Sequence, residues 1–164
     1  MITIGVLSDT HLTGPGKLFR EIVKRCFADV EMILHAGDLT HISVLEAFGN
    51  KKIHAVHGNM CGYQAQVELP NKKIIEVNGF QIGLTHGTGY YHDIEERLYN
   101  DFGPLDCIVY GHTHKAVCHC LGKTLFVNPG SFSATGRYGA SGTYAIITAG
   151  DKLAATIHTV ELNK

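Results

Sequence analysis

Seven residues with metal-binding side chains follow short apolar runs, most of them beside a glycine. They comprise two carboxylates, one amide and four imidazoles: Asp9, His11, Asp38, Asn59, His86, His112 and His114. In Asp9-x-His11 and in His112-x-His114 the two ligands are two residues apart, a spacing that points side chains the same way at the end of a strand. Nitrogen and oxygen donors of this kind suit Mn²⁺, Fe or Zn²⁺ rather than Ca²⁺ or a thiolate zinc site.

The size of this set indicates two metal ions rather than one. Seven ligands are too many for one transition metal, whereas two ions that share one carboxylate would use them all. Two ions about 3.5–4 Å apart form a clamp for in-line displacement at phosphorus. Taken singly, each residue has an ordinary explanation as a surface histidine or a turn residue. The joint pattern at the ends of five strands favours a metal centre.

The apolar runs before these residues must position them. Buried strands are expected over 2–7, 31–35 and 52–56, with helices over 17–27 and, after a cap at Thr40, up to residue 48. Alternating strands and helices predict a parallel sheet with right-handed crossovers. Because the carboxyl ends of parallel strands lie at one edge, we expect the candidate ligands to meet there.

The second half of the chain predicts hairpins and a second sheet. Two strands joined by Asn78-Gly79 carry the strongest short hairpin signal. The segment from Met60 to Pro70 shows no clear structure, and long loops in compact domains tend to be functional. The other expected elements are a helix over 91–102, a short strand over 107–110 and hairpins over 116–127 and 143–160. We expect a single α/β domain over residues 1–164, with two mixed β-sheets between helices.

Composition limits the classes of function. The chain has 164 residues, enough for one domain with a substantial core. A net charge of −1 argues against a protein that binds nucleic acid through a basic surface. No apolar run approaches the ~18 residues of a membrane span, and the first residues do not resemble a signal peptide. Five cysteines without an export signal favour a reducing cytoplasm.

The order of the motifs resembles a known family. The chain reads Ser8-Asp9-Thr10-His11, Gly37-Asp38, Gly58-Asn59, His86-Gly87 and Gly111-His112-Thr113-His114. This series resembles the calcineurin-like metallophosphoesterase superfamily, and Asn128-Pro129-Gly130-Ser131 looks like its small bacterial and archaeal phosphodiesterases. The resemblance implies a four-layer αββα sandwich.

The resemblance also implies an assignment of ligands and a reaction. Asp9, His11 and His114 would hold a first ion, Asn59, His86 and His112 a second, and Asp38 would bridge them. The implied activity is hydrolysis of a small phosphoester, with a diester favoured, by in-line attack of a hydroxide that bridges two divalent ions. Asn59 would also stabilise the phosphoryl oxygens. We expect Mn²⁺ first, with Ni²⁺, Fe²⁺, Co²⁺ or Zn²⁺ as alternatives, and the resemblance allows a homodimer.

One position departs from the family pattern. Many members follow the glycine–asparagine pair with a histidine that protonates the leaving group, whereas this chain has Met60 there. A thioether cannot donate a proton. The alternatives are Cys61, His41, water, or a substrate whose leaving group needs no proton.

Other residues and functions stay open. Arg137 in the loop from Ser133 to Gly142 could contact a phosphate, and Tyr90-Tyr91-His92 could line the pocket, although an exposed loop arginine and an aromatic helix start need no function. Cys118 and Cys120 are expected to pack inward as small hydrophobes. Rival functions are a catalytically silent protein-binding scaffold, as in a retromer subunit of this fold, or a nuclease, which the neutral charge makes less favourable.

Overall fold

Two five-stranded sheets form the centre of the molecule. The computed structural model describes residues 1–133 and 141–161. The first sheet has the order β10-β9-β1-β2-β3 and the second the order β4-β5-β6-β8-β7. The strands are β1 (Ile2–Leu7), β2 (Met32–His35), β3 (Lys52–Ala55), β4 (Lys72–Val77), β5 (Phe80–Thr85), β6 (Cys107–Val109), β7 (Ala116–Leu121), β8 (Thr124–Pro129), β9 (Thr143–Ala149) and β10 (Leu153–Thr159).

Both sheets are mixed, as the sequence predicted. In the first sheet β1, β2 and β3 run parallel, while β9 pairs antiparallel with β1 and with β10. In the second sheet β5, β6 and β8 are parallel, and the edge strands β4 and β7 are antiparallel to their neighbours. The carboxyl ends of the parallel strands therefore lie along one edge of each sheet.

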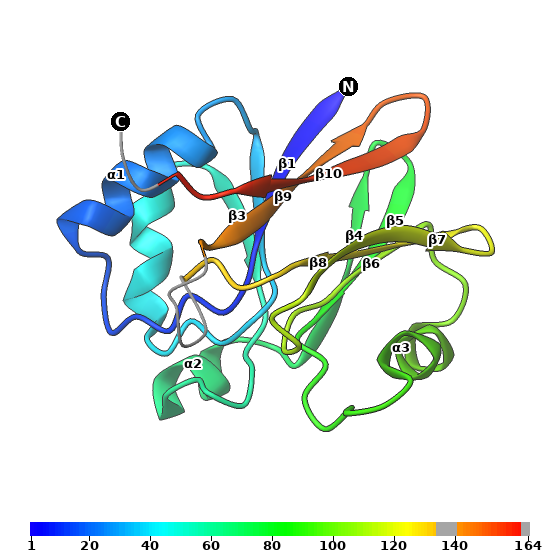
Figure 1. Cartoon of the computed structure of the whole chain (residues 1–164), viewed down its shortest axis with the longest axis horizontal. Helices are drawn as coiled ribbons and strands as arrows, with labels where there is room; N and C mark the ends of the chain where they lie inside the picture. The colour runs from blue at the N-terminus through cyan, green and yellow to red at the C-terminus, as the bar shows by residue number, and fades with distance from the viewer. Residues whose placement is uncertain (134–140, 162–164) are drawn as a thin grey trace.

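Helices cover the outer face of each sheet (Figure 1). The helices α1 (Lys17–Cys26) and α2 (Tyr63–Glu68) and the 3₁₀ helix η1 (Ile42–Phe48) pack on the first sheet through one apolar cluster. The helix α3 (Ile94–Phe102) packs on the second sheet through another. A third cluster fills the space between the sheets. The predicted four-layer αββα sandwich is confirmed.

The structure corrects several predicted boundaries. The segment expected to lack structure contains α2, which the sequence did not reveal because its apolar Tyr63 and Val67 are exposed and only Ala65 is buried. The second helix is a 3₁₀ helix, and its N-cap is His41, whose ring accepts the Ser43 backbone N–H, rather than Thr40.

The prediction that Cys118 and Cys120 are packed inward is wrong. Both are exposed, because β7 is an edge strand with a single neighbour, β8. The Cys118 thiol donates to the carbonyl of Ala155 on β10, which belongs to the opposite sheet. The side chain thus turns toward the gap between the sheets but lies at its open border.

Within residues 1–133 and 141–161 we find no helix of the length and hydropathy needed to cross a membrane.

Candidate metal centre

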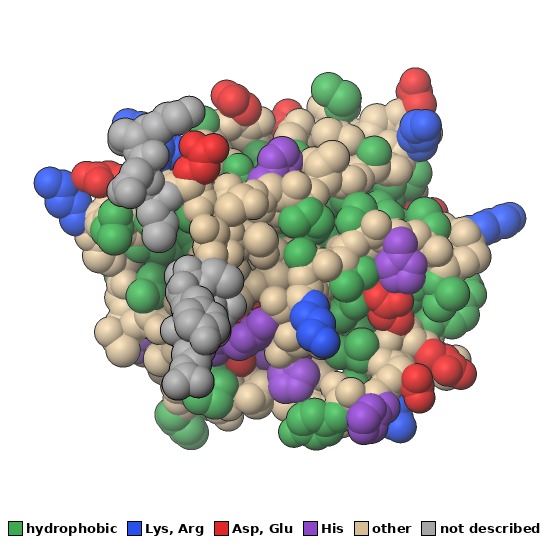
Figure 2. Space-filling model, viewed as in Figure 1, with side chains coloured by type: hydrophobic (Ala, Val, Ile, Leu, Met, Phe, Trp, Pro, Cys, Tyr) green, Lys and Arg blue, Asp and Glu red, His purple; other side chains and the backbone are tan. Residues whose placement is uncertain are grey.

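The loops that follow five strands carry the seven candidate ligands. Asp9 and His11 follow β1, Asp38 follows β2, and Asn59 follows β3; in the second sheet His86 follows β5, and His112 and His114 follow β6. The two sheets therefore contribute to one edge of the sandwich. Figure 2 shows histidine side chains gathered in the lower middle of the molecular face that it draws.

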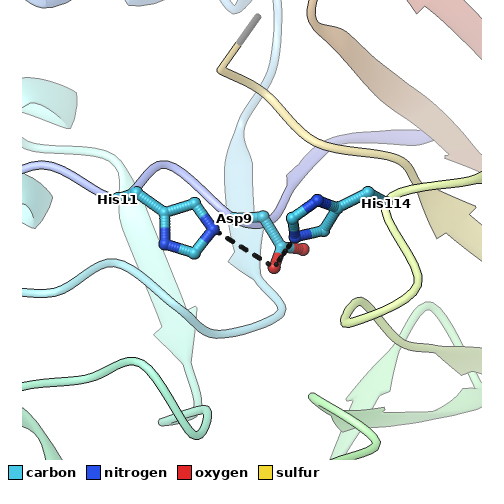
Figure 3. Close-up of side chains that lie close together, drawn as sticks. All are labelled: Asp9, His11 and His114. Carbon is cyan, nitrogen blue, oxygen red and sulfur yellow. Dashed lines mark hydrogen bonds and ion pairs between the residues drawn. The ribbon is translucent and has the colours of Figure 1, made fainter. Parts of the chain in front are cut away.

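Asp9 lies at the centre of two groups of potential ligands. The ligand atoms of Asp9, His11 and His114 lie within 4.8 Å of one another, and so do those of Asp9, Asp38 and His86. The Asp9 Oδ1 atom is 3.1 Å from His114 Nε2 and 3.7 Å from His11 Nε2 (Figure 3). The first group has the three members that the family resemblance assigns to one ion.

The second group contains a buried imidazole nitrogen without a hydrogen-bond partner. His86 donates its Nδ1–H to the carbonyl of Ala36 at 2.7 Å, which leaves the lone pair of Nε2 free in the neutral ring. This Nε2 atom lies 3.1 Å from Asp38 Oδ2 and 3.9 Å from Asp9 Oδ1, yet no well-angled hydrogen bond satisfies it. Two carboxylates around a nitrogen lone pair fit a divalent cation, and oxygen and nitrogen are the donors that Mn²⁺, Fe or Zn²⁺ accept.

Two of the predicted ligands, His112 and Asn59, are not members of these groups. The His112 ring meets the His86 ring edge-on, with centroids 5.2 Å apart. The Asn59 Oδ1 atom accepts a 3.5 Å hydrogen bond from the Thr88 hydroxyl. The assignment of His112 and Asn59 to a second ion, and of Asp38 as its bridge to the first, therefore remains a prediction.

Five of the seven candidate ligands have a left-handed backbone conformation. Their φ angles lie between +49° and +68°, a region that non-glycine residues seldom adopt: Asp9, His11, Asp38, His112 and His114. Such residues cost of order 1–3 kcal/mol each and cluster at functional sites. The tight turns after the strands aim these side chains at a common space.

Burial and neighbouring charges shift the pKa values of three groups in the centre. Burial would raise the pKa of Asp38, but contact with His86 and the backbone N–H of Met60 lower it overall. Burial and the nearby His86 lower the pKa of His112. Burial also lowers the pKa of His86, but Asp38 and Asp9 raise it further, so the net shift is upward. Asp38 is therefore ionised and His112 neutral near pH 7, the forms in which a carboxylate and an imidazole can bind a metal ion, whereas an ion at His86 Nε2 would have to displace a proton when the ring is protonated.

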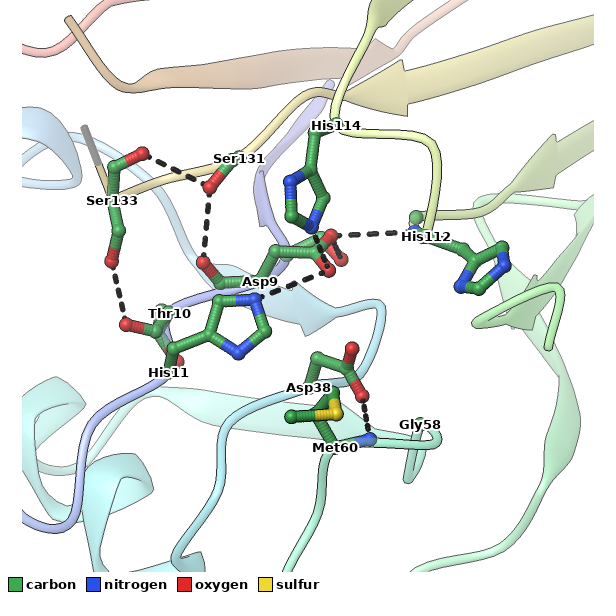
Figure 4. Close-up of polar contacts among 12 residues, drawn as sticks. Asp9, Thr10, His11, Asp38, Gly58, Met60, His112, His114, Ser131 and Ser133 are labelled. Atoms are coloured by element: carbon green, nitrogen blue, oxygen red, sulfur yellow. Dashed lines mark hydrogen bonds and ion pairs between the residues drawn. The ribbon is translucent and has the colours of Figure 1, made fainter. Parts of the chain in front are cut away.

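Backbone contacts hold the Asp38 carboxylate in place (Figure 4). The Met60 backbone N–H donates to Asp38 Oδ1 at 2.7 Å. Gly58 makes this approach feasible, because a Cβ atom there would lie 2.2 Å from Asp38 Oδ1. The backbone after β3 therefore positions the Asp38 carboxylate, and this contact does not involve the thioether of Met60.

The structure adds residues that the sequence did not identify as parts of the site. The Ser131 hydroxyl donates to the Asp9 carbonyl at 3.2 Å and the Ser133 hydroxyl to the Thr10 carbonyl at 2.6 Å (Figure 4). Asn128 donates to the Gly111 carbonyl at 2.9 Å. The end of β8 and the segment after it therefore hold the backbones of the loops that carry Asp9 and His112. A hydrogen bond from a side chain to a backbone carbonyl far away in the sequence produces no motif, so the sequence could not predict these contacts.

The proposed proton donors lie outside the two ligand groups. Cys61 is buried in the apolar cluster beneath α2, and its sulfur accepts the Gly58 backbone N–H. His41 is exposed and caps η1. Tyr91 contacts the centre, with its ring 5.9 Å from that of His112, whereas Arg137 lies outside the described residues.

Comparison with known proteins gives a consistent result. The family model for the calcineurin-like phosphoesterase superfamily domain matches residues 2–152. A probable metallophosphoesterase of Methanothermobacter thermautotrophicus is 36% identical over 132 residues, covering 78% of this chain and 76% of the relative. A phosphodiesterase of Methanocaldococcus jannaschii is 30% identical over 142 residues, covering 77% of this chain and 82% of that protein.

The fold also occurs in a protein that is named for sorting rather than hydrolysis. The wild-type Vps29 of Entamoeba histolytica, whose structure was solved with Zn²⁺, superimposes with a TM-score of 0.74 at 19% identity. The match covers 99% of this chain and 100% of that protein. At this identity the similarity extends to the fold alone.

Proposed function

This chain belongs to the calcineurin-like phosphoesterase superfamily, and on that premise we propose that it is a phosphodiesterase that uses two divalent metal ions. The observation that carries the proposal is that two ligand groups share Asp9, and that one of them also contains Asp38 and the buried His86, whose Nε2 has no hydrogen-bond partner. When bound, two divalent ions lower the pKa of water, which supplies hydroxide near neutral pH, and they offset the negative charge of the phosphoryl group.

The residues would divide the work as follows. Asp9, His11 and His114 hold the first ion, His86, His112 and Asn59 the second, and Asp38 contributes to both. The amide of Asn59 also donates to a phosphoryl oxygen of the substrate. Mn²⁺ is the ion we expect, since the donors are nitrogen and oxygen and availability selects among Mn²⁺, Ni²⁺, Fe²⁺, Co²⁺ and Zn²⁺.

The proton for the leaving group is best supplied by water. The thiol of Cys61 is buried among apolar side chains, and the ring of His41 is engaged in capping η1. Met60 cannot donate a proton. We therefore propose that the enzyme favours diesters whose leaving alcohol is acidic, because such a group departs without strong protonation.

The shared role of Asp38 can be tested by a single substitution. Asp38→Ala should lose both ions together and reduce hydrolysis of a bis-aryl phosphate by about 100-fold or more, because the carboxylate serves both sites. Metal content by mass spectrometry and the rate with added Mn²⁺ are the measurements.

The matched control is Asp151→Ala, since Asp151 lies exposed in the turn between β9 and β10. This variant should keep both the ions and the rate. Retention of one ion at full occupancy in Asp38→Ala would contradict the shared role. If the wild-type protein binds the ions but hydrolyses no mono- or diester, the scaffold function becomes the better account.

A further inference from the structure

The two carboxylate oxygens of Asp9 have different surroundings. The Oδ1 atom faces imidazole nitrogens, at 3.1 Å from His114 Nε2, 3.7 Å from His11 Nε2 and 3.9 Å from His86 Nε2. The Oδ2 atom faces protein donors. It accepts the Ser8 hydroxyl at 2.6 Å. It also accepts the His112 backbone N–H at 3.3 Å, a contact that Figure 4 draws. One oxygen is thus directed at the candidate metal centre and the other away from it.

The Ser8 hydroxyl is committed to this contact. Ser8 and Asp9 are both fully buried, so water does not compete for either side chain. The other polar neighbours of the hydroxyl are the carbonyl oxygens of Ala36 at 3.2 Å and Gly37 at 3.4 Å. A hydroxyl has one proton to donate, and a short bond to an ionised carboxylate is the strongest of the three.

Gly111 closes the other side of the pair. A Cβ atom at this position would lie 2.1 Å from Ser8 Oγ and 2.9 Å from the Ala36 carbonyl oxygen. The chain that leaves β6 therefore passes directly against the serine, which brings the next backbone N–H, that of His112, onto Oδ2. Glycine is the residue type that permits this approach.

From this geometry we propose that Ser8 is a positioning residue that restricts Asp9 to metal binding through Oδ1 alone. The proposal rests on the proposed function. A carboxylate with both oxygens free can bind an ion through one or both of them. Occupation of Oδ2 by two donors removes the second mode, which leaves a coordination position of the ion open for water or substrate.

Cobalt-loaded protein provides the test, since the visible absorption of Co²⁺ weakens as its coordination number rises. Ser8→Ala removes the shorter of the two hydrogen bonds to Oδ2 and leaves that from His112. The variant should bind Co²⁺ about 10–100-fold more weakly, because Asp9 is oriented less firmly, and should show a weaker visible band per bound ion, because Oδ2 can then join the coordination. Ser8→Cys, which keeps an atom at the γ position but donates weakly, should change in the same direction. The affinity is measured by competition with a chelator.

The control is Thr124→Val, which removes another buried hydroxyl. Thr124 begins β8, at the end of that strand remote from the site, and its hydroxyl donates to the Leu105 carbonyl. It should leave affinity and spectrum unchanged. If wild-type protein binds Co²⁺ and both Ser8 variants match it in affinity and spectrum, the positioning role is wrong while the proposed function stands. If the wild type binds no Co²⁺, the proposed function itself fails, and the role of Ser8 fails with it.

Discussion

His35 connects the loops that carry Asp9 and Asp38. The Gly37 backbone N–H points at its Nδ1 atom at 3.2 Å, and the Thr10 hydroxyl lies 3.2 Å from its Nε2 atom. A backbone N–H can only donate, so Nδ1 accepts and the ring proton sits on Nε2. The side chain is fully buried, and burial lowers its pKa to about 3. The fold therefore requires the neutral imidazole.

This requirement predicts a pH dependence of stability. In the unfolded chain His35 takes up a proton near pH 6.5, whereas in the folded protein it does so near pH 3. The stability that it contributes is present above pH 6.5 and is lost as the pH falls through this window, by about 1.4 kcal/mol per pH unit. Between pH 7 and pH 5 the loss should approach about 2 kcal/mol in the free energy of unfolding.

Urea denaturation of the metal-free protein at the two pH values measures this effect. In His35→Gln, whose side chain does not titrate, the difference between pH 7 and pH 5 should shrink by that amount. Because the two pH values are compared within one protein at a time, any loss of stability that the substitution causes at both pH values cancels. Equal differences in the wild type and in His35→Gln would show that His35 does not titrate as described.

The elements that carry the ligands were predictable, because their signals are local. Short apolar runs ending in polar turns identified β1, β2, β3, β5 and β6, and the ends of parallel strands meet at one edge. The helix α2 was missed since its exposed apolar residues show no buried face. The exposure of Cys118 was missed because a strand's place at the edge of a sheet depends on the topology of the whole chain.

Contacts between remote elements account for the rest of the site. The bond from Ser131 to the Asp9 carbonyl joins residues 122 positions apart, and that from Ser133 to the Thr10 carbonyl spans 123. Every residue has a backbone carbonyl, so the residue type of the acceptor gives no sign of these hydrogen bonds and no sequence motif predicts them. The hydrogen bond of Ser8 to one oxygen of Asp9 could not be predicted for another reason. It depends on how closely the backbone at Gly111 packs against Ser8.

The loop between β5 and α3 places an aromatic side chain beside the metal centre. Tyr91 is 82% exposed, and its ring lies edge-on to that of His112 with centroids 5.9 Å apart. A ring that is open to solvent on this side can contact an aromatic ester group of a bound diester. Contacts between two aromatic rings contribute about 0.5–1.5 kcal/mol to binding, which corresponds to a roughly 3–10-fold change in affinity.

Substitution of Tyr91 tests this contact. Tyr91→Ala should raise KM for a bis-aryl phosphate by roughly 3–10-fold with little change in kcat or in bound metal, because the contact is made before and during reaction alike. Tyr91→Phe keeps the ring and should behave as the wild type. Steady-state kinetics on aryl and methyl aryl diesters provide the comparison. An unchanged KM in Tyr91→Ala would exclude the contact.

At the scale of the whole molecule, two divalent ions would add four positive charges to a chain whose net charge is −1. Because the candidate ligands occupy one edge of the sandwich, this charge would be concentrated there, where it attracts an anionic phosphoester. The five cysteines are all free thiols.

The central claim is that this edge binds two ions and hydrolyses a phosphodiester with them. Its most direct test is the rate of bis-p-nitrophenyl phosphate hydrolysis by metal-free protein as Mn²⁺ is added in known equivalents per chain. We predict no hydrolysis without metal, and a rate that rises to a plateau at two equivalents. A plateau at one equivalent, or no hydrolysis at any loading with Mn²⁺ or with Ni²⁺, Co²⁺, Fe²⁺ or Zn²⁺, would contradict the claim.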